Sequence, residues 1–290
     1  MLKIERFARI EEELKKKGSL EIPSLSQMLG CSEETVRRDL RELESVGKLN
    51  RIRGGAYLSD KYDKTYASPL RKTLYQQEKS QMSQKAMEFI HDRDVLFLDS
   101  STTCLTLAGL LLNSKLSLTI VTNSMMICSL CTDPNSHINL ICLGGSLRAR
   151  TLSFVGYHTT DILSTYYADC AFISSPKATL SEGLSDNYLN EARVRESMLK
   201  HARRRFLIMD HTKFDESANI RFNGLELVDT IITDAPLSAE WAAFCQAQNI
   251  NVVTCSQRLL RIPVERLIRQ LRRAPYGLGQ HGSLHFSQQV

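Results

Sequence analysis

The stretch CSEETVRRDLRELESVGKLNRIR, residues 31–53, decides how the rest of the chain is interpreted. Ser32 is a suitable helix N-cap because its hydroxyl can accept a hydrogen bond from an otherwise unpaired backbone amide. Glu33 and Glu34 place negative charge at the positive end of the helix dipole. A helix is therefore predicted to begin at Glu33, and Gly47 can supply the left-handed residue that ends it.

This helix is predicted to pack by one face and to carry cations on another. Val36, Leu40 and Leu43 follow one another at steps of four and three residues, so they form one apolar stripe. The arginines that fall outside this stripe are Arg37, Arg38 and Arg41. A capped helix with a basic exposed face is typical of proteins that bind DNA.

Two shorter elements are predicted before the basic helix. Apolar residues at helical spacing predict a first helix that ends at Gly18. Leu20 and Ile22 then alternate with polar neighbours, after which Ser24 is expected to cap a short second helix that Gly30 ends. The apolar positions are Ile4, Phe7, Ile10 and Leu14 in the first helix, and Leu25, Met28 and Leu29 in the second.

Residues 49–58 form two short apolar segments around Gly54 and Gly55, which predicts a β-hairpin. Three helices, a tight turn and a hairpin together predict a winged helix-turn-helix domain. The alternative is that an arginine-rich helix is only a solvated surface. The joint occurrence of a capped helix, a glycine turn, a basic helix and a wing flanked by arginines favours DNA binding.

The predicted partner of this domain is double-stranded operator DNA. Side chains near the N-terminus of a recognition helix reach base edges, whereas more distant cations contact phosphates. The predicted base-edge residues are Ser32, Glu33, Thr35 and Arg38. The predicted phosphate contacts are Arg37, Arg41, Arg51 and Arg53, with Gly54 and Gly55 at the tip of the wing.

Length and composition place few constraints on function. The chain has 290 residues, of which 42% are hydrophobic, so two ordinary domains are expected. The net charge of +5 does not by itself indicate nucleic-acid binding. No apolar run approaches the roughly 18 residues of a membrane helix, so we expect no membrane partner and a cytoplasmic protein. Cys128 and Cys131 form a CxxC pair without a second pair, which favours an amphipathic helix over a metal site.

The chain beyond residue 77 alternates between strand-like and helix-like segments, which indicates βαβ units and a mainly parallel sheet. The predicted fold class is therefore α/β, with an N-terminal winged helix-turn-helix. Strands are predicted at residues 95–99, 118–122, 138–145, 170–174, 206–209, 230–233 and 251–254. The predicted organisation is a DNA-binding domain at 1–58, a linker at 59–77, an effector domain at 78–256, and a basic, partly disordered extension at 257–290.

Ligands of an open α/β sheet bind at the carboxyl ends of its strands. Several predicted strands are followed there by hydroxyl, amide, glycine or charged residues, which suit an anion such as a phosphate at a helix N-terminus. These residues are Asp99, Ser100, Ser101, Thr102, Thr103, Asn123, Gly144, Gly145, Arg148, Asp210 and Lys213. The alternative for any one loop is that its hydroxyls only cap the next helix.

Several motifs resemble the DeoR family of bacterial sugar-operon regulators. In the first domain they are TVRRDLRELE at Thr35 to Glu44 and RIRGGA at Arg51 to Ala56. In the second domain they are LDSSTT, TNS, LGGSLRARTLSFVG, ADCAF, NEARV and DHTKF. The resemblance implies an effector domain with the ribose phosphate isomerase/CoA transferase-like fold. Ribose phosphate isomerase and glucosamine phosphate deaminase share this fold.

By this resemblance, the loop from Ser100 to Thr103 would hold a phosphate. The side chains that would face the sugar are Asp99, Asp169, Glu191 and Lys213. The chain departs from the family pattern at Ser101, where a glycine is usual and where a side chain could crowd the phosphate. It also departs from the pattern at residues 174–176, and at Arg195 and Glu196, where the family has Lys and Arg.

The resulting hypothesis is a transcriptional repressor of a carbohydrate operon, controlled by a phosphorylated sugar and acting as a homo-oligomer, a dimer or a tetramer. No cofactor, metal or catalytic residue is predicted. One alternative is a constitutive DNA-binding protein whose effector site has decayed. The other is a sugar phosphate isomerase or deaminase that uses Glu191 or Asp99 as a general base.

Overall fold

The computed structural model describes residues 2–17, 19–45, 48–52, 54–57, 71–72, 74–133 and 136–255. The predictions for Gly18, Gly47, Arg53 and the basic extension lie outside the described residues, as does most of the predicted linker. Among the described helices, none combines the length and apolarity needed to cross a bilayer.

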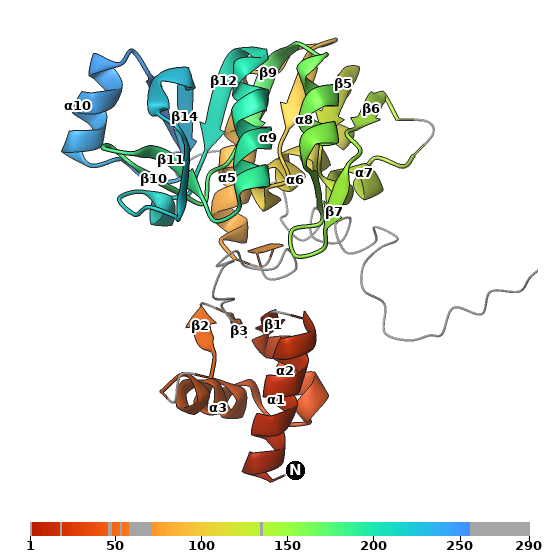
Figure 1. Cartoon of the computed structure of the whole chain (residues 1–290), viewed down its shortest axis with the longest axis vertical. Coiled ribbons are helices and arrows are strands. Elements are labelled where there is room, and N and C mark those ends of the chain that lie inside the picture. The colour runs from red at the N-terminus through yellow and green to blue at the C-terminus, as the bar shows by residue number, and fades with distance from the viewer. Residues whose placement is uncertain are drawn as a thin grey trace, which may run out of the picture.

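The N-terminal part is a winged helix-turn-helix (Figure 1). Its elements are α1 (Lys3–Lys17), β1 (Ser19–Glu21), α2 (Ile22–Leu29), α3 (Glu33–Ser45), β2 (Asn50–Ile52) and β3 (Gly55–Tyr57). The three strands form an antiparallel sheet in the order β1-β3-β2, so the predicted hairpin is extended by a third strand. The prediction of three helices and a wing is confirmed.

The core of this part lies between the three helices and the small sheet. Ile10 and Leu14 of α1 are buried against the stripe of α3, as their spacing predicts. Ile4 was expected on the same apolar face of α1 as Ile10 and Leu14. Its side chain is 79% exposed, so that prediction is wrong. Ile4 lies in the first turn of α1, beyond the end of the packed interface.

The start of α2 differs from the prediction. The helix begins at Ile22 with Glu21 as its N-cap, and Pro23 occupies the first turn. Proline is favoured there because its missing N–H would have no intrahelical partner. Ser24 is therefore inside the helix rather than its cap, whereas Gly30 adopts the left-handed conformation that ends the helix, as predicted (φ 61°).

The C-terminal part is built on a seven-stranded sheet in the order β15-β14-β12-β9-β4-β5-β6. All its strand pairs are parallel, which confirms the predicted sheet. The strands are β4 (Val95–Leu98), β5 (Leu118–Thr122), β6 (Ile138–Cys142), β9 (Ala168–Ile173), β12 (Ala202–Ile208), β14 (Thr230–Thr233) and β15 (Asn251–Thr254).

Two smaller antiparallel sheets were not predicted. One pairs β7 (Ser146–Arg148) with β8 (Ser153–Val155). The other joins β10 (Lys177–Thr179), β11 (Gly183–Asp186) and β13 (Ile220–Asn223). Two short 3₁₀ helices follow β12 and β13, at His211–Lys213 (η1) and Leu225–Leu227 (η2). These additions position side chains near one edge of the large sheet.

Helices cover both faces of the large sheet (Figure 1). One face carries α5 (Gln76–Met87), α6 (Thr102–Leu112) and α7 (Met125–Leu130), and the other carries α8 (Tyr157–Ser164), α9 (Leu189–Lys200) and α10 (Ala239–Ala247). Each face has its own apolar core. Leu96 and Leu98 of β4 pack with the first group of helices, whereas Phe97 packs with the second. This alternation follows from the two-residue period of a strand.

The strand order reverses between β4 and β9. Strands β4, β5 and β6 are added in one direction, and β9, β12, β14 and β15 are added in the other. The loops that leave the carboxyl ends of β4 and β9 therefore diverge to opposite faces. Such a topological switch point is where open α/β sheets bind ligands.

Candidate functional site

The amino end of α3 has the geometry that the sequence predicts. The backbone N–H of Thr35 donates to Ser32 Oγ at 3.3 Å, which confirms Ser32 as the N-cap. The hydroxyls of Ser32 and Thr35 lie 3.0 Å apart and are exposed. Both are therefore accessible at the end of the helix that enters the major groove in this class of domain.

Three of the predicted phosphate-contacting arginines are held by carboxylates within the winged helix. Ion pairs join Arg37 to Glu33 at 2.6 Å, Arg41 to Glu34 at 3.2 Å, and Arg51 to Glu44 at 2.6 Å. All six side chains are at least one-third exposed. Exposed ion pairs contribute little stability, so these arginines can exchange their carboxylates for DNA phosphates.

Arg38 is placed differently from these three arginines. Its side chain is exposed, and no ion pair within the described part of the chain restrains it. It lines a groove of about 340 Å³ between α1 and the start of α3. The groove is lined by Lys3, Arg6, Ser32, Glu34, Thr35, Arg38, Asp39 and Glu42. Three of the four predicted base-edge residues, Ser32, Thr35 and Arg38, therefore share one surface.

A buried ion pair ties α1 to α3 beneath that groove. Asp39 is 1% exposed, and its two carboxylate oxygens accept from Arg6 Nε at 2.6 Å and from Arg6 Nη2 at 3.0 Å. The two parallel hydrogen bonds fix orientation as well as distance. Sequence reasoning missed this pair, although an aspartate beside the apolar stripe of α3 was a signal for a buried partner.

The wing is fixed to α2 by its glycine turn. Gly54 has φ 93°, a conformation that favours glycine. Its carbonyl accepts a hydrogen bond from the N–H of Ile22 at 2.9 Å. Gly55 is the first residue of β3.

At the switch point of the large sheet, Asp99 joins the ends of β4 and β9. Its carboxylate accepts from the N–H of Ser101 at 3.0 Å and from the N–H of Ser174 at 3.1 Å. The first bond fixes the loop after β4, and the second holds the loop after β9 against it. Asp99 is 1% exposed, so a buried negative charge marks the site.

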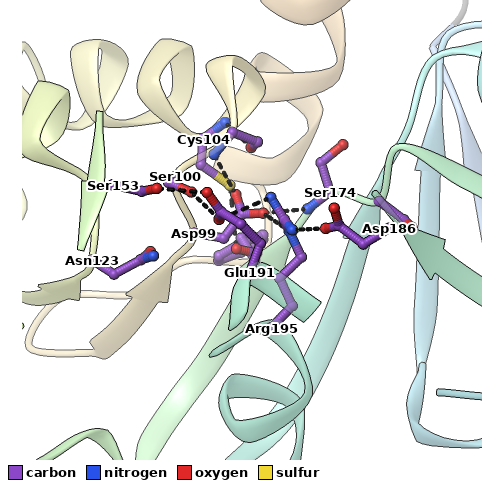
Figure 2. Close-up of polar contacts among 12 residues, drawn as sticks. Asp99, Ser100, Cys104, Asn123, Ser153, Ser174, Asp186, Glu191 and Arg195 are labelled. Atoms are coloured by element: carbon purple, nitrogen blue, oxygen red, sulfur yellow. Dashed lines mark hydrogen bonds and ion pairs between the residues drawn. The ribbon is translucent and has the colours of Figure 1, made fainter. Parts of the chain in front are cut away.

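Arg195 of α9 lies at the centre of the site, among three carboxylates (Figure 2). Its Nε is 2.9 Å from Asp99 Oδ2, its Nη1 pairs with Asp186 of β11, and its Nη2 is 3.7 Å from Glu191 Oε2. All four side chains are at most 5% exposed. The site is therefore a closed ionic network in which the cation comes from a helix and the anions come from a strand end, a small sheet and the same helix.

Glu191 is the most heavily hydrogen-bonded carboxylate of this network. Its Oε1 accepts from Thr151 at 2.7 Å, Ser153 at 2.6 Å and Arg148 at 3.2 Å, and its Oε2 accepts from Ser100 at 3.1 Å. Burial alone would raise the pKa of Glu191. The charge of Arg195 and the hydroxyl donors outweigh that effect and lower the pKa to about 2, so the group is ionised at neutral pH.

Arg148 reaches the network from β7, a strand that the sequence did not predict. Its guanidinium lies 4.3 Å from the centre of the Tyr188 ring and also donates to Thr151 at 3.1 Å. A guanidinium stacked on a ring is held in plane. Arg148 is therefore oriented before any ligand arrives.

The side chains of the hydroxyl loop after β4, residues 100–103, have different hydrogen-bond partners. Ser101 adopts an extended conformation (φ −73°), and its Oγ caps α6 by accepting from the N–H of Cys104 at 3.1 Å. Ser100 donates to Glu191. Thr103 Oγ1 is buried and has no hydrogen-bond partner among the described residues. The position of Ser101 needs no left-handed backbone, and its side chain is directed to the helix.

Lys213 approaches the network from η1. Its Nζ lies 3.3 Å from Asp210 Oδ2 and donates to Ser174 Oγ at 3.0 Å. A second lysine, Lys79 of α5, is 5% exposed and donates to the carbonyls of Arg71 and Leu74. Burial, together with the charge of Lys213, lowers the pKa of Lys79 to about 7.

The residues after β5 and β6 contribute less. Asn123 donates to the Phe154 carbonyl at 3.0 Å, and its buried Oδ1 has no partner in the described structure. Gly144 is open on its Cα side, whereas a Cβ at Gly145 would lie 2.1 Å from Thr159 Oγ1. Gly145 is thus explained by the close approach of α8.

Asp169 was predicted to face the sugar, and its position in the structure contradicts that prediction. It is the second residue of β9, whereas Ser174 follows the carboxyl end of the same strand. Its Oδ2 accepts from the N–H of Val95, the first residue of β4. Asp169 therefore lies at the amino edge of the parallel sheet, a strand length of about 17 Å from the network. It cannot face the same ligand as Asp99.

Sequence reasoning missed several residues in the network or beside it. Arg195 was noted only as a departure, although it follows Glu191 by four residues and so shares its helix face. The others carry no local signal because their contacts are made over long sequence separations. The missed residues are Arg71, Lys79, Thr151, Ser153, Asp186 and Arg195.

Comparison with protein families agrees with both parts of the fold. Residues 6–62 match the DeoR-like helix-turn-helix domain, and residues 75–235 match the DeoR C-terminal sensor domain. The second match covers more than half of the chain and contains Asp99, Glu191 and Lys213.

Individual relatives align along most of their length. The chain is 30% identical to the HTH-type transcriptional regulator IolR of Bacillus subtilis, over 87% of this chain and 99% of the relative. It is 29% identical to the glycerol-3-phosphate regulon repressor of Escherichia coli, over 81% and 92%. It is 30% identical to the lactose phosphotransferase system repressor of Staphylococcus epidermidis, over 81% and 93%.

Among solved structures, ribose 5-phosphate isomerase A of Methanocaldococcus jannaschii is 15% identical, with a TM-score of 0.35 over 47% of this chain and 53% of that chain. This is a partial likeness, whereas the matches to the two domains and to full-length relatives extend over most of the sequence. The chain belongs to the DeoR family of helix-turn-helix transcriptional regulators.

Proposed function

We propose that this DeoR-family regulator is a repressor that binds operator DNA through α3 and the wing, and that a phosphorylated sugar binds at the switch point of its sheet domain. The observation that carries the proposal is the charged network around Arg195, which lies where an open α/β sheet binds ligands. Family membership makes the chain a transcriptional regulator and not an enzyme.

The DNA-binding surface supports the first half of the proposal. Ser32, Thr35 and Arg38 are accessible together at the start of α3, and Arg37 and Arg41 are exposed beside them. Short polar groups at the helix end suit base edges, and exposed arginines suit phosphates. Arg37 and Arg41 would release Glu33 and Glu34 when they meet DNA.

The network supports the second half. A phosphorylated sugar requires cations for its phosphate and carboxylates or amides for its hydroxyls. Arg148 and Lys213 supply fixed cations, and Asp99 and Glu191 supply acceptors. The unpartnered buried oxygens of Thr103 and Asn123 mark places where a ligand could donate or accept.

The names of relatives favour the same ligand class. One is a glycerol-3-phosphate regulon repressor, and another is a lactose phosphotransferase system repressor. Both names combine repression with carbon metabolism. The specific sugar is not indicated by these names, so a panel of phosphorylated and free sugars is the appropriate probe.

DNA binding and ligand binding are tested by separate experiments. A gel-shift titration at physiological salt should show stronger binding to a selected duplex than to random DNA, and equal binding to both would contradict a sequence-specific regulator. In a thermal-shift screen, a ligand at 100 times its Kd stabilises the folded state by about 2.7 kcal/mol. We expect such a shift with at least one phosphorylated sugar.

One observation favours the alternative of a constitutive regulator. Arg195 already pairs with Asp99 and Asp186, so the carboxylates that would receive a sugar are occupied by a side chain of the protein. Under that alternative, Arg195 replaces a ligand permanently. No phosphorylated or free sugar would then change either the melting temperature or the affinity for DNA.

We further propose that the protein binds DNA as a homo-oligomer, because two recognition helices match two half-sites. Tyr157 and Ile162 of α8 and the nearby Tyr167 are exposed and apolar, which supports a contact surface on this side of the sheet domain. Light scattering of the full chain tests this: a mass of one chain at micromolar concentration would contradict it.

A further inference from the structure

Arg71 brings a charged side chain into the sheet domain from outside it. The residue precedes α5, on the side of the chain that leads back to the winged helix. Its carbonyl accepts from Thr102 Oγ1 at 3.3 Å and from Lys79 Nζ at 2.5 Å. Arg71 is thus attached to the hydroxyl loop and to α5 by its backbone.

The residues that follow Arg71 are attached to the same edge of the sheet. Lys79 also donates to the Leu74 carbonyl at 2.6 Å. The ring of Tyr75 meets the ring of His211 edge to face, with centroids 6.1 Å apart. His211 begins η1, which also carries Lys213. The segment that enters the sheet domain therefore contacts two of the loops that form the proposed effector site.

The guanidinium of Arg71 has two unsatisfied donors in the part of the chain that the structure describes. Its Nε and Nη2 are buried and make no hydrogen bond to any described residue. Burial lowers the pKa of Arg71. The charges of Glu191 and Asp99 act in the opposite direction, and those of Arg195 and Arg148 lower it further. An arginine stays protonated in a protein. Arg71 is therefore a buried cation next to the ionic network, and a buried cation without a partner is unfavourable.

The carboxylates of the network are already engaged elsewhere. Asp99 accepts from two backbone amides and from Arg195. Glu191 accepts from three hydroxyls and from Arg148. Within the part of the chain that the structure describes, no carboxylate is left to pair with Arg71, so an external anion can take that place. A guanidinium presents parallel N–H donors that match the oxygens of a phosphate.

We propose that Arg71 is an effector-binding residue contributed by the connecting segment, and that its donation to the anionic group of the ligand transmits ligand binding to the DNA-binding domain. This inference rests on the proposed function of the site. The residues discussed above for ligand binding lie within the sheet domain, from β4 onwards. Arg71 precedes that domain, so a ligand held by both joins the sheet domain to the segment that leads to the winged helix.

The melting temperature of the ligand-free protein distinguishes an effector-binding role of Arg71 from a purely structural role. If the side chain only filled space or stabilised the fold, its replacement would lower the melting temperature. If it is an unpaired cation awaiting an anion, replacement by a neutral side chain of similar length relieves the cost of burying the charge. The ligand-free protein should then melt at the same temperature or higher.

The test uses inorganic phosphate as the probe and the full chain as the protein. Melting temperatures are measured with and without phosphate for wild type, Arg71→Gln and Arg71→Lys. The control is Lys115→Gln, which removes one exposed charge after α6. Wild type and the control should be stabilised by phosphate. Loss of a charged hydrogen bond should weaken phosphate binding by about 10- to 100-fold in Arg71→Gln, with an intermediate loss in Arg71→Lys.

Two results would overturn the inference. One is that phosphate does not stabilise wild type, and the other is that it stabilises wild type and Arg71→Gln equally. Specific DNA binding of wild type and of the control Lys115→Gln is measured in the absence of ligand, where the two should be equal. Loss of specific DNA binding by wild type would contradict the proposed function instead, so the two failures are distinguishable.

Discussion

Arg195 Nε lies 2.9 Å from Asp99 Oδ2, and this contact joins the two halves of the sheet domain at its switch point. Asp99 follows β4, from which β5 and β6 are added, whereas Arg195 lies on α9, which leads into β12 on the other side. Both side chains are at most 5% exposed. The pair therefore contributes to the structure of the domain as well as to the site.

Replacing Arg195 should destabilise the sheet domain strongly. Arg195→Met leaves Asp99 and Asp186 without their cation, and breaking a buried pair in this way costs about 3 to 5 kcal/mol. Urea denaturation of the full chain measures the loss. The matched control is Arg193→Met, which replaces an exposed arginine on the same helix and should change the free energy of unfolding by less than about 0.5 kcal/mol. Equal effects of the two variants would show that the network does not stabilise the fold.

Glu191 should make stability depend on acid pH. Its pKa is lowered from 4.5 to about 2, so it favours folding fully above pH 4.5 and loses that contribution as the pH falls towards 2. The contribution is on the order of 3 kcal/mol. The difference in unfolding free energy between wild type and Glu191→Gln should therefore shrink between pH 5 and about 3. The difference reduces, but does not remove, the opposing effect of Asp186, whose pKa is raised by burial and, in wild type, also by the charge of Glu191. A difference that is constant with pH would refute this assignment.

Arg37 and Arg38 should differ in how they affect DNA binding. Arg37→Ala should weaken binding to all sequences and lower the salt slope by about 1, as expected for a phosphate contact. Arg38→Ala should cost about 1 to 3 kcal/mol on the preferred site and relax the preference at one base pair. Binding to selected and random duplexes at several salt concentrations separates the two effects. If both variants changed selected and random binding alike, the assignment of Arg38 to base edges would be wrong.

The Arg6 and Asp39 pair should control the orientation of α3. Asp39→Asn removes the charge that holds both donors of Arg6, so α1 and α3 are no longer joined by two parallel bonds. We expect a lower melting temperature for the winged helix and weaker binding to a selected duplex. Glu5→Gln, at an exposed position of α1, is the control and should bind like wild type. Unchanged affinity in Asp39→Asn would show that the pair is not needed for the DNA-binding geometry.

The parts of the fold that could be predicted from sequence are those with local signals. The Ser32 cap and the apolar stripe of Val36, Leu40 and Leu43 gave α3 its start and its buried face. Alternating apolar segments gave the parallel sheet, and the rule for strand ends then gave Asp99 and Ser100 as site residues. Each of these inferences depends on residues that are close together in the chain.

The remaining parts depend on contacts between distant segments. Asp186 reaches Arg195 only because β11 pairs with β13 beside α9, and no periodicity indicates that pairing. Asp169 was assigned to the sugar by the family resemblance alone, although the predicted strand at 170–174 already placed it at the amino end, opposite the edge where ligands bind. Arg71 was missed because its segment has no periodic pattern, and its role depends on what it lacks in the folded protein.

Control of DNA binding by a ligand in the sheet domain is the central claim, and one measurement tests it most directly. A labelled duplex selected from random DNA is titrated with the full chain, and its fluorescence anisotropy is measured. The titration is done with and without each phosphorylated sugar and its free counterpart. At least one phosphorylated sugar, but not its free form, should change the Kd for DNA by about 5-fold or more, which corresponds to a coupling of about 1 kcal/mol or more. An unchanged Kd across the whole panel would contradict the claim and favour a constitutive regulator.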